Sequence, residues 1–367
     1  MRHIFLLSIF LFFLSSCDKD ESSEFVDGFD RSSMLTNWVD NIIIPSFIHF
    51  NNSLQNLDQA VDDFIENPNA MNYDELSNLW LDSYKSWQHV QMFNINLAED
   101  IEYQEKINTY PTDTNLIHDN ILQSVSNLNN DENETAIGFP AMDYMLHGLD
   151  IDKNSIIEQY ISSNSAENNK NYLKDIIKSM IAISSQVSED WNSSRISFIN
   201  STDNTATSSL NKIINDYIYY FEKYFRDGKI GIPSGMRSGG MIQPTTVEAL
   251  YKKNVSKDLT LEALLACKNF FTGNSTNNIS SGVSLEDYLN YLPTSSENNL
   301  SQDITDQFND IETSLNNINQ TFYDQIETDK WVLVDVFLEM QEMVALLKTD
   351  MLGALNIATD YTDTDGD

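Results

Sequence analysis

Residues 135–150 read Thr135-Ala-Ile-Gly-Phe-Pro-Ala-Met-Asp-Tyr-Met-Leu-His-Gly-Leu-Asp150 and carry the clearest structural signal in the chain. Pro140 suits the first turn of a helix and Gly148 suits its end, so we expect a helix between them. Asp143 and His147 lie four residues apart within it, on one side of the helix. The spacing therefore predicts a carboxylate and an imidazole one helical turn apart.

The same residues resemble a known motif. Residues 138–143 read Gly-Phe-Pro-Ala-Met-Asp and are similar to the signature G-x-H-x-x-E of the imelysin-like family, which carries a peptidase label. Pro140 occupies the position of the family's histidine, and Asp143 occupies that of its glutamate. This variant resembles the branch of the family found in Bacteroidetes-type bacteria.

Further segments resemble the family in chain order. Residues 80–100 contain W-x-x-x-Y-x-x-W-Q followed by Ala-Glu-Asp, residues 107–113 resemble its I-N-x-aromatic-P-x-D turn, and residues 229–235 resemble its K-I-G-I-P-x-G loop. The resemblance implies an all-α fold of two bundle-like domains, with this loop near the signature motif at the domain interface. The ligand-binding candidates on that basis are Gly138, Phe139, Pro140, Asp143, Lys229, Arg237 and Ser238.

Hydrophobic periodicity predicts the same fold class from the residues alone. Apolar residues recur at spacings of three and four in long segments, and 12 Gly and 7 Pro in 367 residues are few for a loop-rich β protein. We predict an all-α protein with two packed helical bundles, residues 34–200 and 201–360, followed by an acidic tail at 361–367.

Two helix ends are expected inside these bundles. Pro45 lacks a backbone N–H and should kink or end the first helix near Ile44. Gly228 suits the position just past the end of the helix that begins near Leu210. The segment from Lys229 to Gly240 is then expected to form a glycine-rich loop.

The N-terminus has the features of a targeting segment. Arg2 is followed by an apolar run, Ile4 to Leu14, that is too short to span a bilayer. The next residues, Leu14-Ser-Ser-Cys17, resemble a bacterial lipobox, in which the chain is cut before the cysteine and the cysteine receives lipid. We predict a signal peptide at 1–16, a lipidated tether at 17–33, and a lipoprotein whose membrane partner is the outer membrane, on its periplasmic face or at the cell surface.

The charge balance limits the partners. The chain has 56 acidic against 21 basic residues and a formal net charge of −35. Such a surface repels the phosphates of nucleic acids, so no nucleic-acid partner is expected. It attracts cations, although a solvated acidic face that keeps the protein soluble has the same composition.

Acid and imidazole groups near the family-like segments are candidate metal ligands. They are Glu99, Asp100, Asp113, Asp143 and His147. Oxygen and nitrogen ligation suits iron, manganese or zinc. The competing interpretation is structural, with these acids capping helices or pairing with Arg237 and Lys229.

Catalytic motifs are not evident in the sequence. The chain has no H-E-x-x-H zinc motif among its five histidines, and Pro140 removes the histidine that the family motif would supply. Neither a Ser/His/Asp nor a Cys/His set can be recognised from spacing. Cys267 lies in a helical apolar pattern and is expected to pack in the core.

The imelysin-like family is associated with bacterial iron uptake. The resemblance therefore predicts a cell-envelope lipoprotein that binds iron, another divalent metal, haem or another small ligand at the interdomain site, with iron-uptake components as candidate partners. The family's peptidase label makes a metal-dependent peptidase the first alternative. The substitution at Pro140 also fits a non-catalytic interaction scaffold, which is the second alternative.

Overall fold

The structure is a computed structural model that describes residues 27–125, 127–276, 280–293 and 299–361. In these ranges the chain forms helices and loops, with one isolated β-bridge between Asn274 and Ser281. The predicted all-α fold is confirmed. The predicted signal peptide, Cys17, most of the tether and the tail beyond Tyr361 lie outside the described residues.

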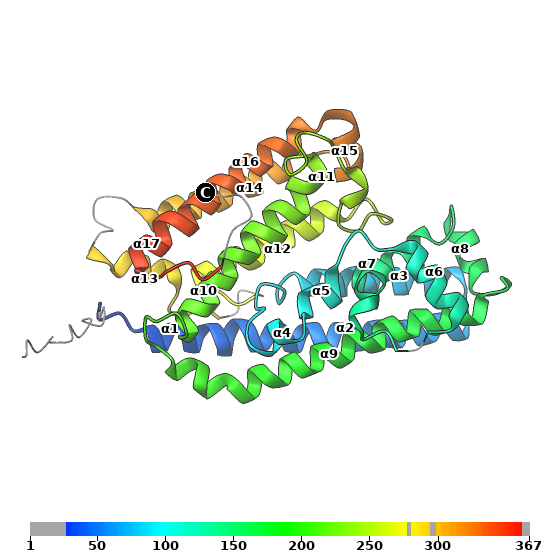
Figure 1. The fold of residues 1–367 in the computed structure, drawn as a ribbon, viewed down its shortest axis with the longest axis horizontal. Coiled ribbons are helices and arrows are strands. Elements are labelled where there is room, and N and C mark those ends of the chain that lie inside the picture. Colours follow the sequence, from blue (N-terminus) through cyan, green and yellow to red (C-terminus); the bar gives the residue numbers. More distant parts are fainter. Residues whose placement is uncertain (1–26, 126, 277–279, 294–298, 362–367) are drawn as a thin grey trace, which may run out of the picture.

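Two helical layers lie one above the other (Figure 1). The first layer is built on α2 (Ile44–Glu66), which packs along both α3 (Ala70–Trp87) and α9 (Ala166–Asn200). The second layer contains α10 (Ser209–Tyr219), α12 (Ser256–Thr272), α14 (Leu300–Asn316) and α16 (Trp331–Ala345). The chain passes from one layer to the other between the end of α9 at Asn200 and the start of α10 at Ser209.

The periodicity of α9 shows why these sequences form packed helices. Its long apolar side chains recur at spacings of three and four and share one side of the helix. Those that are buried in the core are Tyr172, Leu173, Ile176, Ile177, Met180, Ile183, Val187, Trp191 and Phe198. None of the described helices, α9 included, is long and apolar enough to cross a membrane.

The first helix does not end at Pro45, so the predicted end is wrong. The helix α1 (Arg31–Asn37) passes into the π-helix η1 (Trp38–Ile43), and α2 follows directly at Ile44. The hydrogen-bond register changes from π to α just before the proline, so its missing N–H falls where the α-helical ladder restarts. The helix can therefore continue through a proline at this position.

The helix in the second layer does not end at Gly228 either. The π-helix η4 (Tyr220–Gly231) runs through it, and the chain turns only after α11 (Ile232–Ser234), at Gly235 with φ of +88°. A Cβ at position 228 would lie 3.1 Å from the hydroxyl of Tyr110, so this glycine serves close packing. Lys229 consequently lies on a helix and not in a loop.

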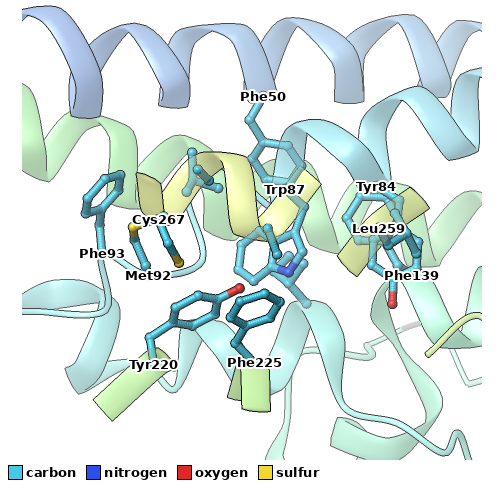
Figure 2. Close-up of a cluster of buried hydrophobic side chains, with 14 of the residues drawn as sticks. Phe50, Tyr84, Trp87, Met92, Phe93, Phe139, Tyr220, Phe225, Leu259 and Cys267 are labelled. Atoms are coloured by element: carbon cyan, nitrogen blue, oxygen red, sulfur yellow. The ribbon is translucent and has the colours of Figure 1, made fainter. Parts of the chain in front are cut away.

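One hydrophobic core runs through both layers. Figure 2 shows Trp87 of the first layer in the same cluster as Tyr220 and Cys267 of the second. Trp38 of η1 stacks on Phe270 of α12 with ring centroids 4.5 Å apart. Burial raises the pKa of the Cys267 thiol, and its predicted place in the core is confirmed. Because the two layers share a core, any polar group between them must find a partner inside the protein.

Candidate functional site

The signature-like segment forms a short helix at the contact between the layers. The helix α7 (Gly138–Asp143) begins at Gly138 with φ of +73° and continues into the π-helix η3 (Tyr144–Gly148). A Cβ at position 138 would lie 2.2 Å from the backbone oxygen of Ile107. Only glycine permits both the left-handed backbone and this close approach.

Phe139 and Pro140, both predicted to contact a ligand, are buried in the protein. The ring of Phe139 stacks on Tyr84 with centroids 4.4 Å apart, and its backbone oxygen accepts a hydrogen bond from the indole of Trp80 at 3.3 Å. These contacts position the helix, and the polar chemistry of the segment begins at Asp143.

Asp143 connects the two layers. Its Oδ2 accepts a hydrogen bond from the backbone N–H of Tyr251 at 2.8 Å, and its Oδ1 accepts one from the backbone N–H of Lys252 at 3.0 Å. The same Oδ1 lies 2.9 Å from Nδ1 of His147, so the predicted pairing one helical turn apart is confirmed. With 1% of its surface exposed and three partners, the carboxylate is satisfied by the protein itself.

His147 extends this contact to Ser77, a residue that sequence reasoning missed. Its Nε2 lies 2.9 Å from Oγ of Ser77 on α3, and Nζ of Lys252 donates to the same oxygen at 2.8 Å. Ser77 and His147 are 70 residues apart, so no local pattern indicates the contact. The structure brings together a carboxylate, an imidazole, a hydroxyl and an ammonium group in one hydrogen-bonded chain.

The five predicted metal ligands are spread over the structure. Glu99 and Asp100 are exposed, and Asp113 caps the helix α6 (Thr114–Gln123) by accepting two backbone N–H bonds at 2.9 and 3.1 Å. Asp143 and His147 are bonded to each other. Within the ranges that the structure describes, no three His, Cys, Asp or Glu side chains are grouped so that they could hold a metal ion. These five residues are therefore not assembled into one site.

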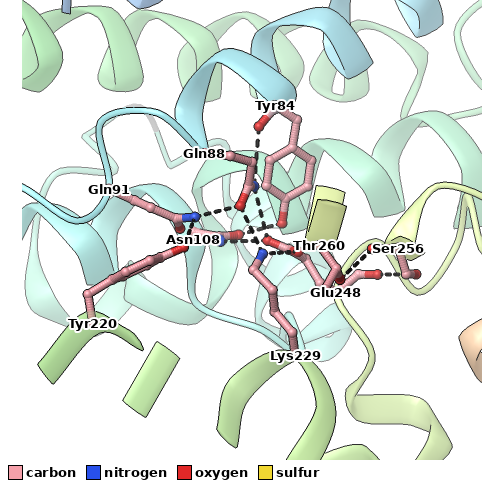
Figure 3. Close-up of polar contacts among 9 residues, drawn as sticks. All are labelled: Tyr84, Gln88, Gln91, Asn108, Tyr220, Lys229, Glu248, Ser256 and Thr260. Atoms are coloured by element: carbon pink, nitrogen blue, oxygen red, sulfur yellow. Dashed lines mark hydrogen bonds and ion pairs between the residues drawn. The ribbon is translucent and has the colours of Figure 1, made fainter. Parts of the chain in front are cut away.

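A second set of polar side chains lies between the layers, and we call it the Lys229 cluster. Its members are Tyr84, Gln88, Gln91, Asn108, Tyr220, Lys229 and Glu248 (Figure 3). Nζ of Lys229 donates to Gln88 Oε1 at 2.9 Å and to Glu248 Oε2. Nδ2 of Asn108 donates to the other oxygen of Glu248 at 2.9 Å. Lys229 and Glu248 are each 2% exposed, so this is a buried ion pair.

The Lys229 cluster adjoins the signature-like segment. The hydroxyl of Tyr84 donates to Asn108, while its ring stacks on Phe139. Lys229 is thus near the motif, as the resemblance implies. Burial lowers the pKa of Lys229, and the attraction of Glu248 acts in the opposite direction. The mutual pairing of these groups favours a structural network that holds the layers in register.

Arg237 and Ser238, the remaining ligand candidates, make contacts within the second layer. Nε of Arg237 donates to Asp227 Oδ2 at 2.9 Å, and its guanidinium lies over Phe337 at 5.5 Å. The hydroxyl of Ser238 donates to the backbone oxygen of Met241 at 2.5 Å. These bonds fix the turn that follows α11.

A cleft of about 700 Å³ lies between the layers. One wall comes from α4 (Leu97–Asp100), α5 (Tyr103–Asn108) and the 3-10 helix η2 (Asp131–Ala136), and the other from α10, η4 and residues 360–361. Its lining includes one lysine, Lys212, and six carboxylates: Glu99, Glu102, Glu105, Glu134, Asp216 and Asp360. Of the predicted site residues, Glu99 lies here. We call this feature the acidic cleft.

The carboxylates of the acidic cleft repel one another. Removal from bulk water raises the pKa of Asp216 well above its usual range, the backbone N–H of Asn94 lowers it, and the charges of Glu99 and Asp360 raise it further. Removal from water also raises the pKa of Glu134, and neighbouring glutamates add to the rise. Oδ1 of Asn94 has no hydrogen-bond partner in the part of the chain that is described. A cation in the cleft would relieve this repulsion.

Comparison with known proteins agrees with the resemblance seen in the sequence. The family model for imelysin matches residues 43–331. An imelysin-like protein from Psychrobacter arcticus 273-4 has a TM-score of 0.70 and 17% identity, with 90% of this chain and 97% of that chain covered. A putative iron-regulated protein A precursor from Parabacteroides distasonis ATCC 8503 has a TM-score of 0.69 and 16% identity, with 88% and 95% covered. No curated protein sequence matches.

Proposed function

The chain belongs to the imelysin family, and from this premise we propose that it binds a hydrated iron cation in the acidic cleft as part of iron acquisition. Two observations support an iron-related role. One structurally similar protein is described as an iron-regulated protein A precursor. The acidic cleft, between the two layers, is lined by six carboxylates and one lysine. The charge of the cleft is the observation that carries the proposal.

The size and spacing of the cleft favour a cation that keeps its own water shell. Its volume of about 700 Å³ is in the range of small-molecule pockets and far exceeds a bare ion. Its described carboxylates do not converge in threes to coordinate a metal directly. Waters that bridge a metal ion to carboxylates form hydrogen bonds nearly as favourable as direct ones. The cleft therefore has room for a hydrated divalent ion, and its charge favours one.

Haem fits the acidic cleft less well. Haem iron needs an axial ligand, which proteins supply from His, Met, Cys or Tyr. Tyr219, Tyr224 and Tyr361 are the candidates among the described lining residues, which include no His, Met or Cys. The hydroxyl of Tyr224 already donates to Glu105 at 2.6 Å, and that of Tyr361 donates to Glu222 at 3.1 Å. The negatively charged propionates of haem would also face the carboxylates of the walls.

Neutralising one carboxylate on each wall should weaken iron binding. The double variant Glu99→Gln/Asp360→Asn is expected to bind Fe²⁺ about tenfold or more weakly than the parent. One carboxylate at about 6 Å in water contributes roughly 1 kcal/mol to binding a divalent ion. The measurement is isothermal titration calorimetry with Fe²⁺ under anaerobic conditions.

A matched control distinguishes the effect of charge in the cleft from the effect of the protein's net charge. Asp303→Asn/Asp310→Asn removes the same two charges from exposed positions on α14 and should leave the affinity unchanged. The cleft variant should melt at the same temperature as the parent or higher, because it loses like-charge repulsion. Equal affinity of all three proteins for Fe²⁺, or a parent that binds none, would refute the proposed function.

We also propose that the protein is held at the membrane by lipid on Cys17. The support is the lipobox-like Leu14-Ser-Ser-Cys17. Replacing Cys17 by Ala is expected to move the protein from the membrane fraction to the soluble fraction of the cell envelope, because one thioether-linked anchor would be lost. Fractionation followed by immunoblotting measures this. A variant that remains as membrane-associated as the parent contradicts the anchor.

A further inference from the structure

We propose that Ser77, His147 and Asp143 form a serine nucleophile site that hydrolyses esters of small acyl groups. This site is distinct from the acidic cleft. A carboxylate bonded to one nitrogen of an imidazole, with the other nitrogen facing a serine hydroxyl, is the arrangement of serine hydrolases, and it is recognised by geometry and not by sequence position. Here both contacts are 2.9 Å long.

The partners of this chain fix the direction of each hydrogen bond. The Asp143 carboxylate only accepts, so Nδ1 of His147 must carry the hydrogen that lies between them. In the neutral imidazole, Nε2 is then the acceptor. The ammonium of Lys252 only donates, so it uses a lone pair of Ser77 Oγ and leaves the hydroxyl hydrogen of Ser77 free to point at His147. This is the polarity that lets an imidazole remove the serine proton.

The groups are held firmly in place. Two backbone N–H bonds fix the Asp143 carboxylate. The imidazole of His147 lies edge-on to the rings of Trp80 and Tyr73, with centroids 5.0 and 6.3 Å away. A base whose orientation is set by packing and by a carboxylate is the condition for efficient proton transfer from a nucleophile.

Lys252 has a position suited to stabilising the charge that develops in such a reaction. Its Nζ is 2.8 Å from Ser77 Oγ, and its side chain is partly exposed whereas Ser77 is buried. An acyl carbon bonded to Oγ would carry its oxyanion within reach of this ammonium group. Lys252 thus marks the side from which a substrate approaches.

The burial of Ser77 restricts the substrate. The residue is only 3% exposed, so we assign a small acyl group such as acetyl, on an oxygen leaving group. Oγ forms a bond to the carbonyl carbon as its proton moves to Nε2 of His147. The bond to the leaving oxygen then breaks, and that oxygen receives the proton. In the second step, water gives a proton to Nε2 of His147 as its oxygen bonds to the acetyl carbon. The bond between that carbon and Oγ then breaks, Oγ takes the proton back from Nε2, and acetate leaves.

The test uses p-nitrophenyl acetate with the full chain. Release of p-nitrophenol is followed by absorbance, and mass spectrometry of quenched, digested protein locates the acetyl group. The parent should become acetylated on Ser77. In the His147→Gln variant, acetylation of Ser77 should be at least about 100-fold slower, as expected for the loss of a general base. Ser77→Ala should lose the corresponding part of the p-nitrophenol release.

A control on the same helix tests specificity. Ser83 is also buried, and its hydroxyl donates to the backbone oxygen of Ser53 at 3.0 Å, so Ser83→Ala should leave Ser77 acetylation unchanged. If the Ser77→Ala variant does not fold, mass spectrometry of the parent and of the His147→Gln variant still shows whether Ser77 is acetylated and whether His147 is needed. A parent without acetyl on Ser77, or a His147→Gln variant that is acetylated there as fast as the parent, overturns the proposal.

Discussion

Replacing Gly138 by alanine is expected to destabilise the protein by about 3–5 kcal/mol or to prevent folding. The backbone at this position has φ of +73°, which costs a residue with a Cβ roughly 1–2 kcal/mol. The added Cβ would also lie 2.2 Å from the backbone oxygen of Ile107, and a backbone atom cannot rotate away as a side chain can. Chemical unfolding in urea, monitored by circular dichroism, measures the loss.

Two other glycines separate the cost of the left-handed backbone from the cost of the close contact with Ile107. Gly239 has φ of +62° but open space around its Cβ position, so Gly239→Ala should cost only roughly 1 kcal/mol. Gly353 lies in the helix α17 (Leu352–Leu355), also with open space, so Gly353→Ala should stabilise by about 0.5–1 kcal/mol. If Gly138→Ala costs no more than Gly239→Ala, the close approach to Ile107 is not what requires glycine.

Replacing Glu248 by alanine is expected to cost about 3–5 kcal/mol of stability, because it leaves the ammonium of Lys229 buried without a counter-charge. Lys229 is 2% exposed and donates to Glu248 and Gln88. Asn108 would lose its acceptor as well. The double variant Lys229→Met/Glu248→Leu should recover most of the loss, since replacing a whole buried pair by apolar groups is often neutral.

The effect of Glu248→Ala should depend on pH. Burial already lowers the pKa of Lys229, and removal of Glu248 takes away the attraction that opposes this shift. The unfolded chain then holds the lysine proton more tightly than the folded protein does, so stability rises with pH in this window. The loss of stability relative to the parent should be largest at neutral pH. It should become smaller as the pH approaches 10.5, the ordinary pKa of lysine. Urea unfolding at a series of pH values measures this trend.

An exposed pair serves as the control for this prediction. Lys170 and Glu167 on α9 are 2.9 Å apart, and the glutamate side chain is 79% exposed. Glu167→Ala should cost at most about 1 kcal/mol and show no such pH trend. A loss in Glu248→Ala as small as this would mean that the Lys229 cluster contributes little to the contact between the layers.

Local interactions were predictable from the sequence. Spacings of three and four predicted the helices because each buried face repeats with the turn of the helix. The contact between Asp143 and His147 followed from the same geometry, since residues four apart on a helix are neighbours. The resemblance to the imelysin-like family added the proximity of Lys229 to the motif.

The two wrongly predicted helix ends both occur at π-helices. At Pro45 and Gly228 the chain continues as a helix where proline and glycine ordinarily end one. In both places a π-helical segment changes the hydrogen-bond register near the residue. Neither residue type nor hydrophobic spacing distinguishes a π-turn from an α-turn, so these ends were beyond sequence reasoning.

The site residues that the sequence did not predict depend on long-range contacts. Ser77 meets His147 from 70 residues away, and the two sides of the acidic cleft come from different layers. In a chain with 56 acidic residues, the sequence does not distinguish the six that line the cleft from the others. Only the packing of the layers shows that Glu99 has carboxylates opposite it, while Asp100 and Asp113 do not belong to that lining.

The position of bound iron is the decisive test of whether the acidic cleft is the metal site. Crystals grown with Fe²⁺ under anaerobic conditions, and measured at the iron absorption edge, give an anomalous difference map that locates the metal. We expect a peak inside the acidic cleft, among Glu99, Asp216 and Asp360. A map with iron at Asp143 and His147, or with no peak in the cleft, would contradict it.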